Sequence, residues 1–351
     1  KKKAMFRNID ITKHSLFLVG ITKQGHWFLQ KASQVDKIKA DKHAILEIET
    51  TNSLVSILPG GMRDRALLCM TNNIPSYLPC DAAFPVLHGS FGEDGTIQGL
   101  FEMAQIPYVG CGVMASSLTM DKEKTKQVWI SENLPVVPFL CLKKAVFLYE
   151  NEKNTIFQEA ESKFGYPLFV KPCCAGSSVG ASKAGDRASL EKAVLEAFKW
   201  DEKILIEPFI NAREIECSVT GNYKVKSYVP GEIIPSHDFY DYEAKYIDPE
   251  GAALLIPAKL SDDKKKKIKD IAEKAYKAVD ASGLSRIDFF VDKKTDEILL
   301  NEINTIPGFT SISMFSKMCE AEGLPYPELI EELLSLAIDR FKTRNALKTS
   351  R

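Results

Sequence analysis

Oxygen-bearing side chains gather on two strand-like segments in the C-terminal part of the chain. The segments are residues 286–292 and 298–304, and the polar turn between them predicts a β-hairpin. If the turn is symmetric, antiparallel pairing places Asp288 directly opposite Glu302, with Asn304 on the same face. Opposed carboxylates destabilise a sheet unless a positive charge lies between them, and Asp, Glu and Asn oxygens suit Mg²⁺. The hairpin therefore predicts a magnesium site, and the alternative is a polar hairpin with one solvated face.

The residues after the hairpin predict a turn that can hold an anion. Asn304 leads into Thr-Ile-Pro-Gly-Phe-Thr-Ser-Ile-Ser, in which Pro307 and Gly308 form the turn. Backbone N–H groups that are free in such a turn can bind an oxyanion. We therefore expect an anionic group beside the metal.

Length, charge and composition restrict what the chain can be. Its 351 residues, 45% of them hydrophobic and 26% charged, suffice for two or three domains with cores of their own. A formal net charge of −1 lacks the basic excess that drives nucleic-acid binding, so DNA and RNA are not expected partners. No apolar run approaches the roughly 20 residues of a membrane span, and no cleavable leader opens the chain. These features predict a soluble protein without a membrane partner.

The eight cysteines are scattered along the chain and form no CxxC pair. Disulfide-stabilised secreted domains are small and have cysteine at high density. We therefore expect reduced thiols and a cytoplasmic location.

Residues 1–118 are predicted to form an α/β unit. Its expected elements are strands at residues 16–21, 83–87 and 107–109 and a helix at residues 96–104. The helical spacing that begins just beyond residue 118 marks the boundary to the next unit.

Residues 119–210 are predicted to form a second unit. It begins with a helix over residues 121–132, which Pro135 and Pro138 close. Its other expected elements are a strand at residues 167–171, a helix at residues 189–199 and a strand at residues 204–207 that ends at Pro208.

Residues 211–351 are predicted to form a third unit, which contains the hairpin. Its other expected elements are strands at residues 214–220, 224–229 and 231–234 and a helix at residues 262–278. The lysine run at residues 264–267 lies on the solvated face of that helix. Together the three units predict a mixed α/β fold.

A glycine-serine loop in the second unit predicts a phosphate-binding segment. Residues 171–180 read Lys-Pro-Cys-Cys-Ala-Gly-Ser-Ser-Val-Gly and follow a buried strand, so backbone N–H groups can approach an anion closely. The segment is not a P-loop, because no Gly-Lys-Ser/Thr triplet precedes a helix. Lys171 at the strand end could pair with a phosphate, or its stem could simply pack on the strand while its charge reaches water.

Three further motifs have weaker chemical meaning. Residues 110–115 superficially match a dinucleotide-binding turn, but no strand-end acid follows at the required distance, so a turn between domains is preferred. His88 ends a strand and precedes a helix start with Glu93 and Asp94, which suits a ligand-binding or a structural role equally. Residues 239–246 combine tyrosines, acids and a lysine, which suits a lid over phosphates or an ordinary surface loop.

Seven blocks stand in a distinctive order between His88 and Ser313. They read HGSFGEDG, MDKEKTK, VKPCCAGSSVG, IEPFI, FYDYEAKY, RIDFF and NEINTIPGFTSIS. In this order and spacing they resemble the D-alanine–D-alanine ligases of the ATP-grasp fold. The resemblance implies a three-domain enzyme that binds ATP between its central and C-terminal domains and joins two D-alanines, through an acyl-phosphate, for peptidoglycan synthesis. It also implies Mg²⁺, with Mn²⁺ as a substitute, and a homodimer formed through the first domain.

The resemblance assigns nucleotide and metal roles to matching residues. Those assigned to ATP are Lys122 and Lys171 at the phosphates, Glu207 and Glu214 at the adenine and ribose, Tyr240, and Lys245 at the transferred γ-phosphate. Those assigned to the metal are Asp288, Glu302 and Asn304, the same set that the hairpin predicts.

The resemblance also assigns roles toward the two D-alanines. Arg286 and the backbone N–H of Gly308 would stabilise the acyl-phosphate and the tetrahedral intermediate. The remaining assignments are Ser313 and the Met314 backbone at the carboxylate of the second D-alanine, and His88, Ser177 and Tyr246 in a hydrogen-bonded wall near the first.

The chain departs from the family pattern at three places. Family members carry an early glycine-rich turn with a glutamate for the first substrate's amino group, and the opening residues Lys-Lys-Lys-Ala-Met-Phe do not match it. That glutamate is therefore either absent or on a segment that precedes these residues. Pro208 stands where many relatives have a lysine, which predicts fewer adenine contacts. Cys173 and Cys174 are adjacent in the phosphate loop, where inert small side chains are preferred to a redox pair.

Three other functions use parts of the same pattern. A D-alanine–D-lactate ligase shares the machinery, but Tyr246 in the lid loop favours dipeptide formation. Another ATP-grasp carboxylate–amine ligase would differ only in its product. A nucleotide-binding regulatory protein without catalysis would explain the missing glutamate, but the set of Lys171, Lys245, Arg286, Asp288, Glu302 and Asn304 argues against it.

Overall fold

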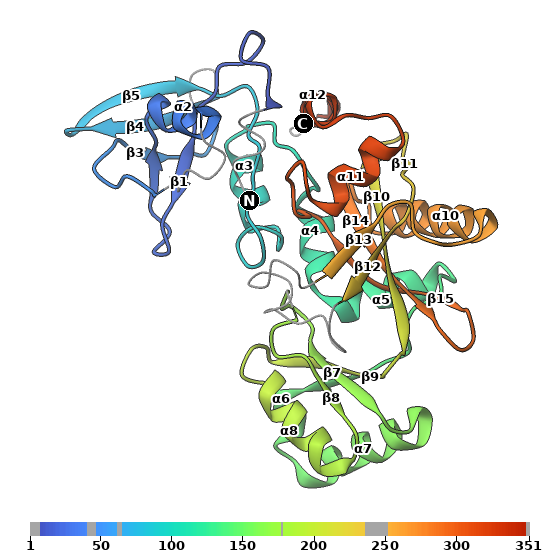
Figure 1. Cartoon of the computed structure of the whole chain (residues 1–351). Helices are drawn as coiled ribbons and strands as arrows, with labels where there is room; N and C mark the ends of the chain where they lie inside the picture. Colours follow the sequence, from blue (N-terminus) through green and yellow to red (C-terminus); the bar gives the residue numbers. More distant parts are fainter. Residues whose placement is uncertain (1–7, 41–46, 62–64, 177, 236–251, 349–351) are drawn as a thin grey trace.

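Three sheets follow one another along the chain in the computed structural model (Figure 1). The structure describes residues 8–40, 47–61, 65–176, 178–235 and 252–348. The strand pairs of these residues are antiparallel, and helices flank the sheets. This arrangement confirms the mixed α/β class. No helix in the described part of the chain is long and apolar enough to cross a membrane.

The first sheet is a meander of five short strands. They are β1 (Val19–Ile21), β2 (Trp27–Leu29), β3 (Leu54–Ser56), β4 (Ala66–Thr71) and β5 (Ile74–Pro79), in that spatial order. Helix α2 (Ala32–Ala40) follows β2, and helix α3 (Thr96–Met103) contributes Ile97 and Phe101 to the core of this unit. The helix expected at residues 96–104 is therefore confirmed, and β1 is shorter than expected.

Two strands expected in this part of the chain are absent. Residues 83–87 and 107–109 meet only in an isolated parallel bridge between Ala83 and Tyr108. Pro85 has no backbone N–H to donate to a ladder, so the apolar run around it does not extend into a strand. The expectation of strands here was wrong.

The second sheet has the spatial order β6-β9-β7-β8. Its strands are β6 (Leu140–Lys143), β7 (Leu168–Pro172), β8 (Ser182–Ala184) and β9 (Lys203–Pro208), and its helices are α6 (Lys144–Phe147), α7 (Glu150–Phe164) and α8 (Arg187–Ala197). Helix α8 begins two residues before the expected start because the Asp186 side chain caps it, accepting a hydrogen bond from the Ser189 backbone N–H at 2.8 Å. Apolar side chains of α7 and α8 pack on this sheet to form a separate core.

The third sheet has the order β13-β12-β10-β14-β15, with β11 paired to β10. Its strands are β10 (Ala212–Gly221), β11 (Lys226–Ser227), β12 (Gly231–Pro235), β13 (Ala252–Leu255), β14 (Gly283–Asp292) and β15 (Ile298–Asn304). One face packs against α4 (Val113–Met120), α5 (Lys122–Ser131) and α10 (Asp262–Ala278). Helices α11 (Met314–Ala321) and α12 (Tyr326–Asn345) belong to a second core that includes Leu284 of β14.

The hairpin of β14 and β15 has the predicted pairing but contains a β-bulge. Asp288 pairs with Glu302, as expected, whereas the next residue, Phe289, pairs with Leu300. Asn301 is therefore the extra residue on β15. The bulge lies directly beside the pair of carboxylates.

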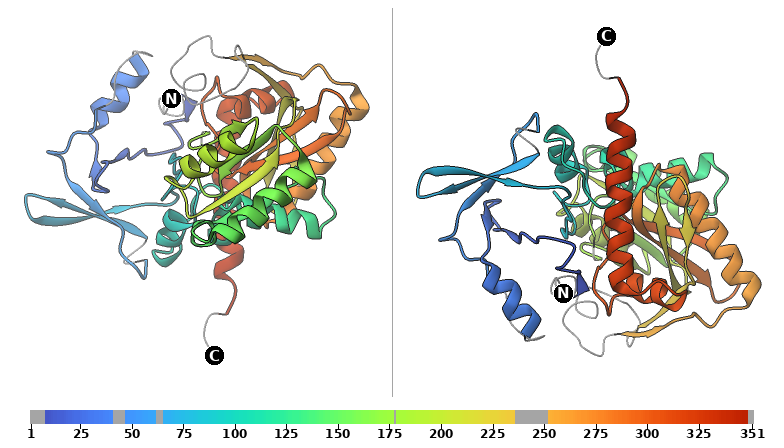
Figure 2. Two further views of the ribbon diagram at one scale, coloured as in Figure 1. Left: turned by 90° about the horizontal axis from the view of Figure 1, so that it is seen from below. Right: turned by 90° about the horizontal axis from the view of Figure 1, so that it is seen from above.

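Two helices connect the units. Trp129 of α5 is fully buried in the core of the third sheet, and its indole N–H donates to the Ala275 carbonyl at 3.0 Å. Figure 2 shows α12 running lengthwise across the molecule, and its Arg340 donates to the carbonyl of Tyr108 at 3.0 Å and to the hydroxyl of Ser282 at 2.8 Å. The domain boundaries at residues 118 and 210 stay predictions.

Candidate active site

Three carboxylates form one row across the polar face of the third sheet. Glu216 of β10 pairs with Asp288 of β14, which pairs with Glu302 of β15. Arg286 and Asn304 form the next pair on the same face of the hairpin. We call these five residues the acidic cluster. Like charges in adjacent cross-strand positions repel, so the row requires positive charge nearby.

Arg286 supplies part of that charge. Its Nε and Nη2 donate to the two oxygens of Asp288 at 2.7 and 2.6 Å, and Nε lies 3.2 Å from Glu216 Oε2. The Asn304 amide donates to Asp288 Oδ2 at 2.9 Å. Burial disfavours the guanidinium charge, but Asp288 and Glu216 outweigh it and raise the pKa of Arg286 well above its usual value.

The acidic cluster has the donor chemistry that a divalent cation requires. Its three carboxylates face one guanidinium, so negative charge is in excess, and its other oxygen donor is an amide. Hard oxygen donors of this kind suit Mg²⁺. No group of three or more His, Cys, Asp and Glu side chains among the described residues is arranged to hold a metal. A metal here would therefore need the Asn304 oxygen and oxygens from its substrates.

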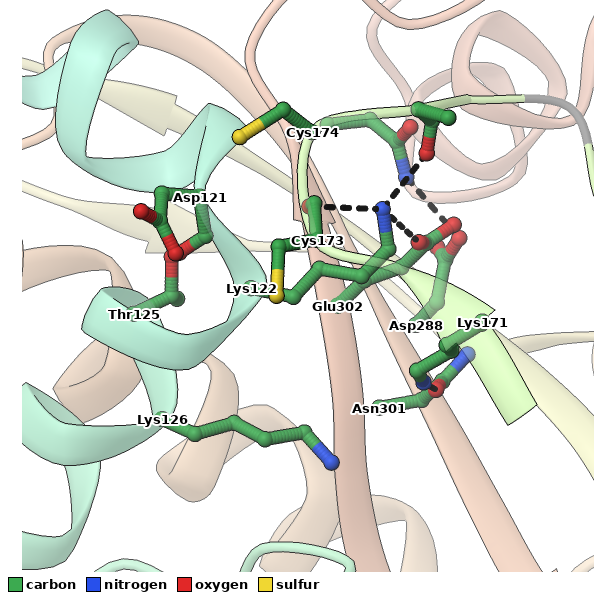
Figure 3. Close-up of polar contacts among 12 residues, drawn as sticks. Asp121, Lys122, Thr125, Lys126, Lys171, Cys173, Cys174, Asp288, Asn301 and Glu302 are labelled. Atoms are coloured by element: carbon green, nitrogen blue, oxygen red, sulfur yellow. Dashed lines mark hydrogen bonds and ion pairs between the residues drawn. The ribbon is translucent and has the colours of Figure 1, made fainter. Parts of the chain in front are cut away.

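Lys122 connects the acidic cluster to the predicted phosphate loop. It is the first residue of α5, whose N-terminus is capped by the Asp121 side chain. Its Nζ donates to the Ala175 carbonyl at 2.7 Å and lies 3.6 Å from Glu302 Oε2. Figure 3 shows this ammonium group between the loop and the two carboxylates of the hairpin.

A second set of charges is buried beside the first. Lys171 of β7 lies 2.9 Å from Glu207 Oε2 and donates to the Asn301 side-chain oxygen at 3.0 Å. Lys126 of α5 contacts the other oxygen of Glu207 and donates to the Val137 carbonyl at 3.0 Å. We call Lys126, Lys171, Glu207 and Asn301 the buried cluster.

Burial and charge oppose one another in this cluster. Burial disfavours ionisation of Glu207, but Lys126 and Lys171 outweigh it and hold the pKa of this carboxyl below its usual range. Burial lowers the pKa of Lys126 to about 8, although Glu207 favours its charged form. Each group therefore favours the charged form of the other.

The two clusters border one cleft between the second and third sheets. The residues that line it include Lys122, Lys171, Glu207, Glu214, Glu216, Asp288, Asn301 and Glu302, together with apolar Phe169, Val179, Ile233 and Phe290. The structure thus brings the predicted phosphate lysines, the predicted adenine-side acids and two predicted metal ligands to one cavity. A cavity in which polar groups converge beside apolar walls is typical of a small-molecule site, and the many charged groups here suit a charged ligand.

The segment around His88 contacts the turn that follows the hairpin. His88 Nδ1 lies 3.0 Å from the Ile306 carbonyl. The Glu93 carboxylate accepts from the backbone N–H groups of Gly89 at 2.7 Å and Ile306 at 3.2 Å, and burial raises its pKa. The predicted His88 is therefore near the hairpin, and Glu93 fixes the approach of the two loops.

The predicted anion-binding turn leads into a helix N-terminus. Ser313 is the N-cap residue of α11 and its hydroxyl lies 2.7 Å from that of Thr310. A side chain at Gly308 would lie 3.4 Å from the Ser313 hydroxyl, so these two residues face each other. Met314, the first residue of α11, is buried. The N-terminus of a helix favours an anion such as a carboxylate.

Four predicted residues, Ser177, Tyr240, Lys245 and Tyr246, lie outside the described residues. In the loop that precedes Ser177, Cys173 is buried, Cys174 is exposed, and both are free thiols. The other predicted site residues are described above. Sequence reasoning missed the roles of Glu93, Lys126, Glu216 and Asn301, although Glu93, Lys126 and Asn301 lie within blocks that carry the resemblance.

Comparison with known proteins agrees with this geometry. Residues 2–111 match the family model described as D-ala D-ala ligase N-terminus, and residues 128–335 match the one described as D-ala D-ala ligase C-terminus. A D-alanine–D-alanine ligase of Treponema denticola is 54% identical over 349 residues, covering 99% of this chain and 94% of the relative. The corresponding ligase of Caldicellulosiruptor bescii is 45% identical, covering 99% of this chain and 93% of the relative.

Solved structures give the same result for the fold. The D-alanine–D-alanine ligase from Coxiella burnetii aligns with a TM-score of 0.80 at 34% identity, covering 98% of this chain and 90% of that structure. A D-Ala:D-Ser ligase from Enterococcus faecalis aligns with a TM-score of 0.81 at 32% identity, covering 95% and 93%. The ATP-grasp fold expected from the sequence is thereby confirmed. The chain belongs to the D-alanine–D-alanine ligase family.

Proposed function

We propose that this protein joins two D-alanines to D-alanyl-D-alanine and converts ATP to ADP and phosphate. One observation carries the proposal: an acidic cluster suited to a divalent cation and a buried cluster with excess positive charge border the same cleft. Phosphoryl transfer needs these two features, because it depends on positioning and on neutralising phosphate charge. The family to which the chain belongs points to D-alanine as the substrate and to peptidoglycan as the destination of the product.

ATP is proposed to bind in the cleft with its phosphates near Lys171 and Lys122. Glu207 and Glu214 would contact the adenine and ribose. Both Glu207 oxygens already accept from lysines, but each can accept a second hydrogen bond from a nucleotide amino group. Tyr240 and Lys245 are proposed from the sequence to act on the nucleotide and its γ-phosphate.

Asp288, Glu302 and Asn304 are proposed to hold Mg²⁺, with Mn²⁺ as a substitute. The metal would neutralise phosphate charge as phosphoryl transfer proceeds. The excess of carboxylates over cations in the acidic cluster supports this assignment.

In the first step, a carboxylate oxygen of the first D-alanine attacks the γ-phosphorus of ATP. The bond from this phosphorus to the bridging oxygen breaks, its electron pair leaves with ADP, and an acyl-phosphate forms. Arg286 and the Gly308 N–H would stabilise negative charge on the transferred group. His88, Ser177 and Tyr246 are proposed to orient the first D-alanine.

In the second step, the neutral amine of the second D-alanine attacks the acyl carbon. A tetrahedral intermediate forms and then expels phosphate as the peptide bond is completed, with loss of one proton from the amine. Ser313 and the Met314 N–H, at the N-terminus of α11, would bind the carboxylate of this D-alanine.

We also infer the setting of the reaction. Three domains, residues 1–118, 119–210 and 211–351, with the nucleotide between the second and third, are proposed for the chain. The eight free cysteines favour the reducing cytoplasm. A homodimer through the first domain is proposed from the family resemblance, and light scattering of the purified protein would measure it.

A product assay tests the proposed function. Phosphate release would be measured with ATP, Mg²⁺ and D-alanine, the product would be identified by mass, and the assay would be repeated with L-alanine, D-lactate and D-serine as the second substrate. We expect D-alanyl-D-alanine, with no ligation of L-alanine. A preference for D-lactate or D-serine would contradict the proposed acceptor. Nucleotide binding without any turnover would contradict the enzymatic activity itself.

A further inference from the structure

We propose that Lys126 and Asn301 are positioning residues that hold Lys171 in place for the phosphates of the nucleotide. The inference deepens the proposed function and rests on its nucleotide-binding part. Each residue reaches Lys171 by a different route, one through a bulge in β15 and one through Glu207.

The bulge brings Asn301 to the cleft. In a regular strand, adjacent side chains point to opposite faces, so Asn301 and Glu302 could not both line one cavity. Here both residues do line the cleft, while Leu300 and Ile303 on either side are buried. The extra residue at the bulge interrupts the alternation of side chains between the two faces of the strand, so Asn301 and Glu302 can both line the cleft. The hairpin therefore presents one more polar side chain than a regular hairpin would.

Asn301 and Glu207 fix two directions of the Lys171 ammonium group. Lys171 donates to the Asn301 oxygen at 3.0 Å and lies 2.9 Å from Glu207 Oε2. An ammonium group has three N–H donors, so one donor is left to point toward a ligand in the cleft. Lysine stems are flexible and lose side-chain entropy when they bind. Two fixed acceptors reduce that loss before the phosphate arrives.

Lys126 acts on the same ammonium group through Glu207. It is fully buried and is not among the residues that line the cleft. It contacts Glu207 Oε1, the oxygen that Lys171 does not use. The Glu207 carboxylate is therefore held by one lysine on each oxygen, and its orientation toward Lys171 depends on Lys126.

The charge of the cluster favours an anionic ligand. Two ammonium groups share one buried carboxylate, which leaves an excess positive charge in a region of low solvent access. An uncompensated buried charge is unfavourable, and a phosphate group beside Lys171 would compensate it. Burial lowers the pKa of Lys126, and the neighbouring charge of Lys171 lowers it further.

A purely structural role for these residues makes a different prediction. If Lys126 only joins α5 to β9, its loss would weaken the whole cleft and reduce the affinity for every part of the nucleotide. A positioning role affects the phosphates alone. ADP with Mg²⁺ and adenosine are therefore the two probes that separate the roles.

The test compares Asn301→Ala, Lys126→Met and Lys126→Arg with the wild type by calorimetric titration. Lys124→Met is the matched control, because Lys124 is an exposed lysine on the same helix. We expect Asn301→Ala and Lys126→Met to weaken MgADP about tenfold, the loss typical of one hydrogen bond to a charged group. Adenosine binding should change less than about twofold. Lys126→Arg should restore part of the loss, and Lys124→Met should have no effect.

A double mutant of Asn301 and Lys171 tests the inference even if the buried variant Lys126→Met fails to fold. Asn301→Ala should have no further effect on MgADP affinity once Lys171→Met is present, because Asn301 acts only through Lys171. Additive losses, equal losses for adenosine and MgADP, or unchanged MgADP affinity in Asn301→Ala would each overturn the inference. Failure of the wild type to bind MgADP would overturn the proposed function as well. If the wild type binds MgADP but ligates nothing, only the proposed enzymatic activity is overturned. The titrations above then still decide the positioning role.

Discussion

The two clusters that border the cleft have opposite excess charge. The acidic cluster sets three carboxylates against one guanidinium, whereas the buried cluster sets two ammonium groups against one carboxylate. Lys122 lies beside the acidic cluster, close to Glu302 and to the phosphate loop. A nucleotide with its bound metal ion likewise has a positive part beside a negative part. The charges of the cleft are therefore complementary to those of a metal–nucleotide complex.

The two clusters also differ in how many of their carboxylates have a cationic side chain of the protein as partner. In the buried cluster each oxygen of the carboxylate has a lysine partner, and water is largely excluded. The acidic cluster contains three carboxylates and one guanidinium, and a bound divalent cation would reduce the repulsion between the carboxylates. We infer that the buried cluster contributes to folding as well as binding, while the acidic cluster serves the reaction and costs stability.

The largest expected effect is the loss of turnover when the acidic cluster is broken. Glu302→Ala should reduce phosphate release by about a thousandfold or more, because it removes a proposed metal ligand needed for phosphoryl transfer. The thermal midpoint should stay close to that of the wild type, since Glu302 is part of no hydrophobic core. Glu297→Ala, in the exposed turn of the same hairpin, is the control and should retain turnover. Normal turnover of Glu302→Ala at saturating Mg²⁺ would refute the metal assignment.

The next effect concerns stability and should appear only in the buried cluster. Glu207→Gln leaves Lys126 and Lys171 without their carboxylate and should destabilise the fold by about 3–5 kcal/mol. The thermal midpoint, measured by circular dichroism, should fall by several degrees while that of Glu302→Ala does not. Equal midpoints for the two variants would remove the distinction between the clusters.

The same variant should reveal a pH dependence of stability. The pKa of Glu207 is lowered in the folded chain, so its ionised form contributes stability above the unfolded pKa of about 4.3, and that contribution is lost as the pH falls through the folded value. The difference in thermal midpoint between wild type and Glu207→Gln should therefore be constant from pH 7 to about pH 5 and shrink in more acidic buffers. A difference that grows on acidification would have the wrong sign for this pairing.

The smallest expected effect is that of the exposed thiol in the phosphate loop. Partial desolvation of the thiol group and the charge of Asp201 raise the pKa of Cys174 to about 11, so the reactive thiolate is scarce at neutral pH. Cys174→Ser should keep turnover within about twofold of the wild type, and iodoacetamide should label Cys174 slowly at pH 7, as followed by mass spectrometry. Fast labelling that abolishes MgADP binding would place this thiol in the working site.

The acidic cluster was largely predictable because its parts are close in sequence. A hairpin needs only alternation and a turn, so the pairing of Asp288 with Glu302 could be predicted and is confirmed. The bulge could not be predicted, because a regular hairpin with a symmetric turn also pairs Asp288 with Glu302. Glu216 was missed since it reaches the row from β10, a strand distant in sequence.

The buried cluster was only half predictable for the opposite reason. Lys171 and Glu207 were expected at the nucleotide, but their partners depend on the tertiary fold. Lys126 meets Glu207 across 81 positions of sequence, and Asn301 meets Lys171 across 130. A lysine on a helix is usually solvated, and nothing local distinguishes Lys126 from its exposed neighbour Lys124. Likewise, an apolar run around Pro85 suggested a strand that the missing N–H prevents.

The most direct test of the opposite charges of the two clusters is a crystal structure of the protein with ADP and Mn²⁺, with the metal located by its anomalous signal. We expect the metal at Asp288, Glu302 and Asn304 and the phosphates between it and Lys171, with Lys171 still bonded to Asn301 and Glu207. A metal bound away from the acidic cluster, or a nucleotide whose phosphates lie away from Lys171, would contradict the account.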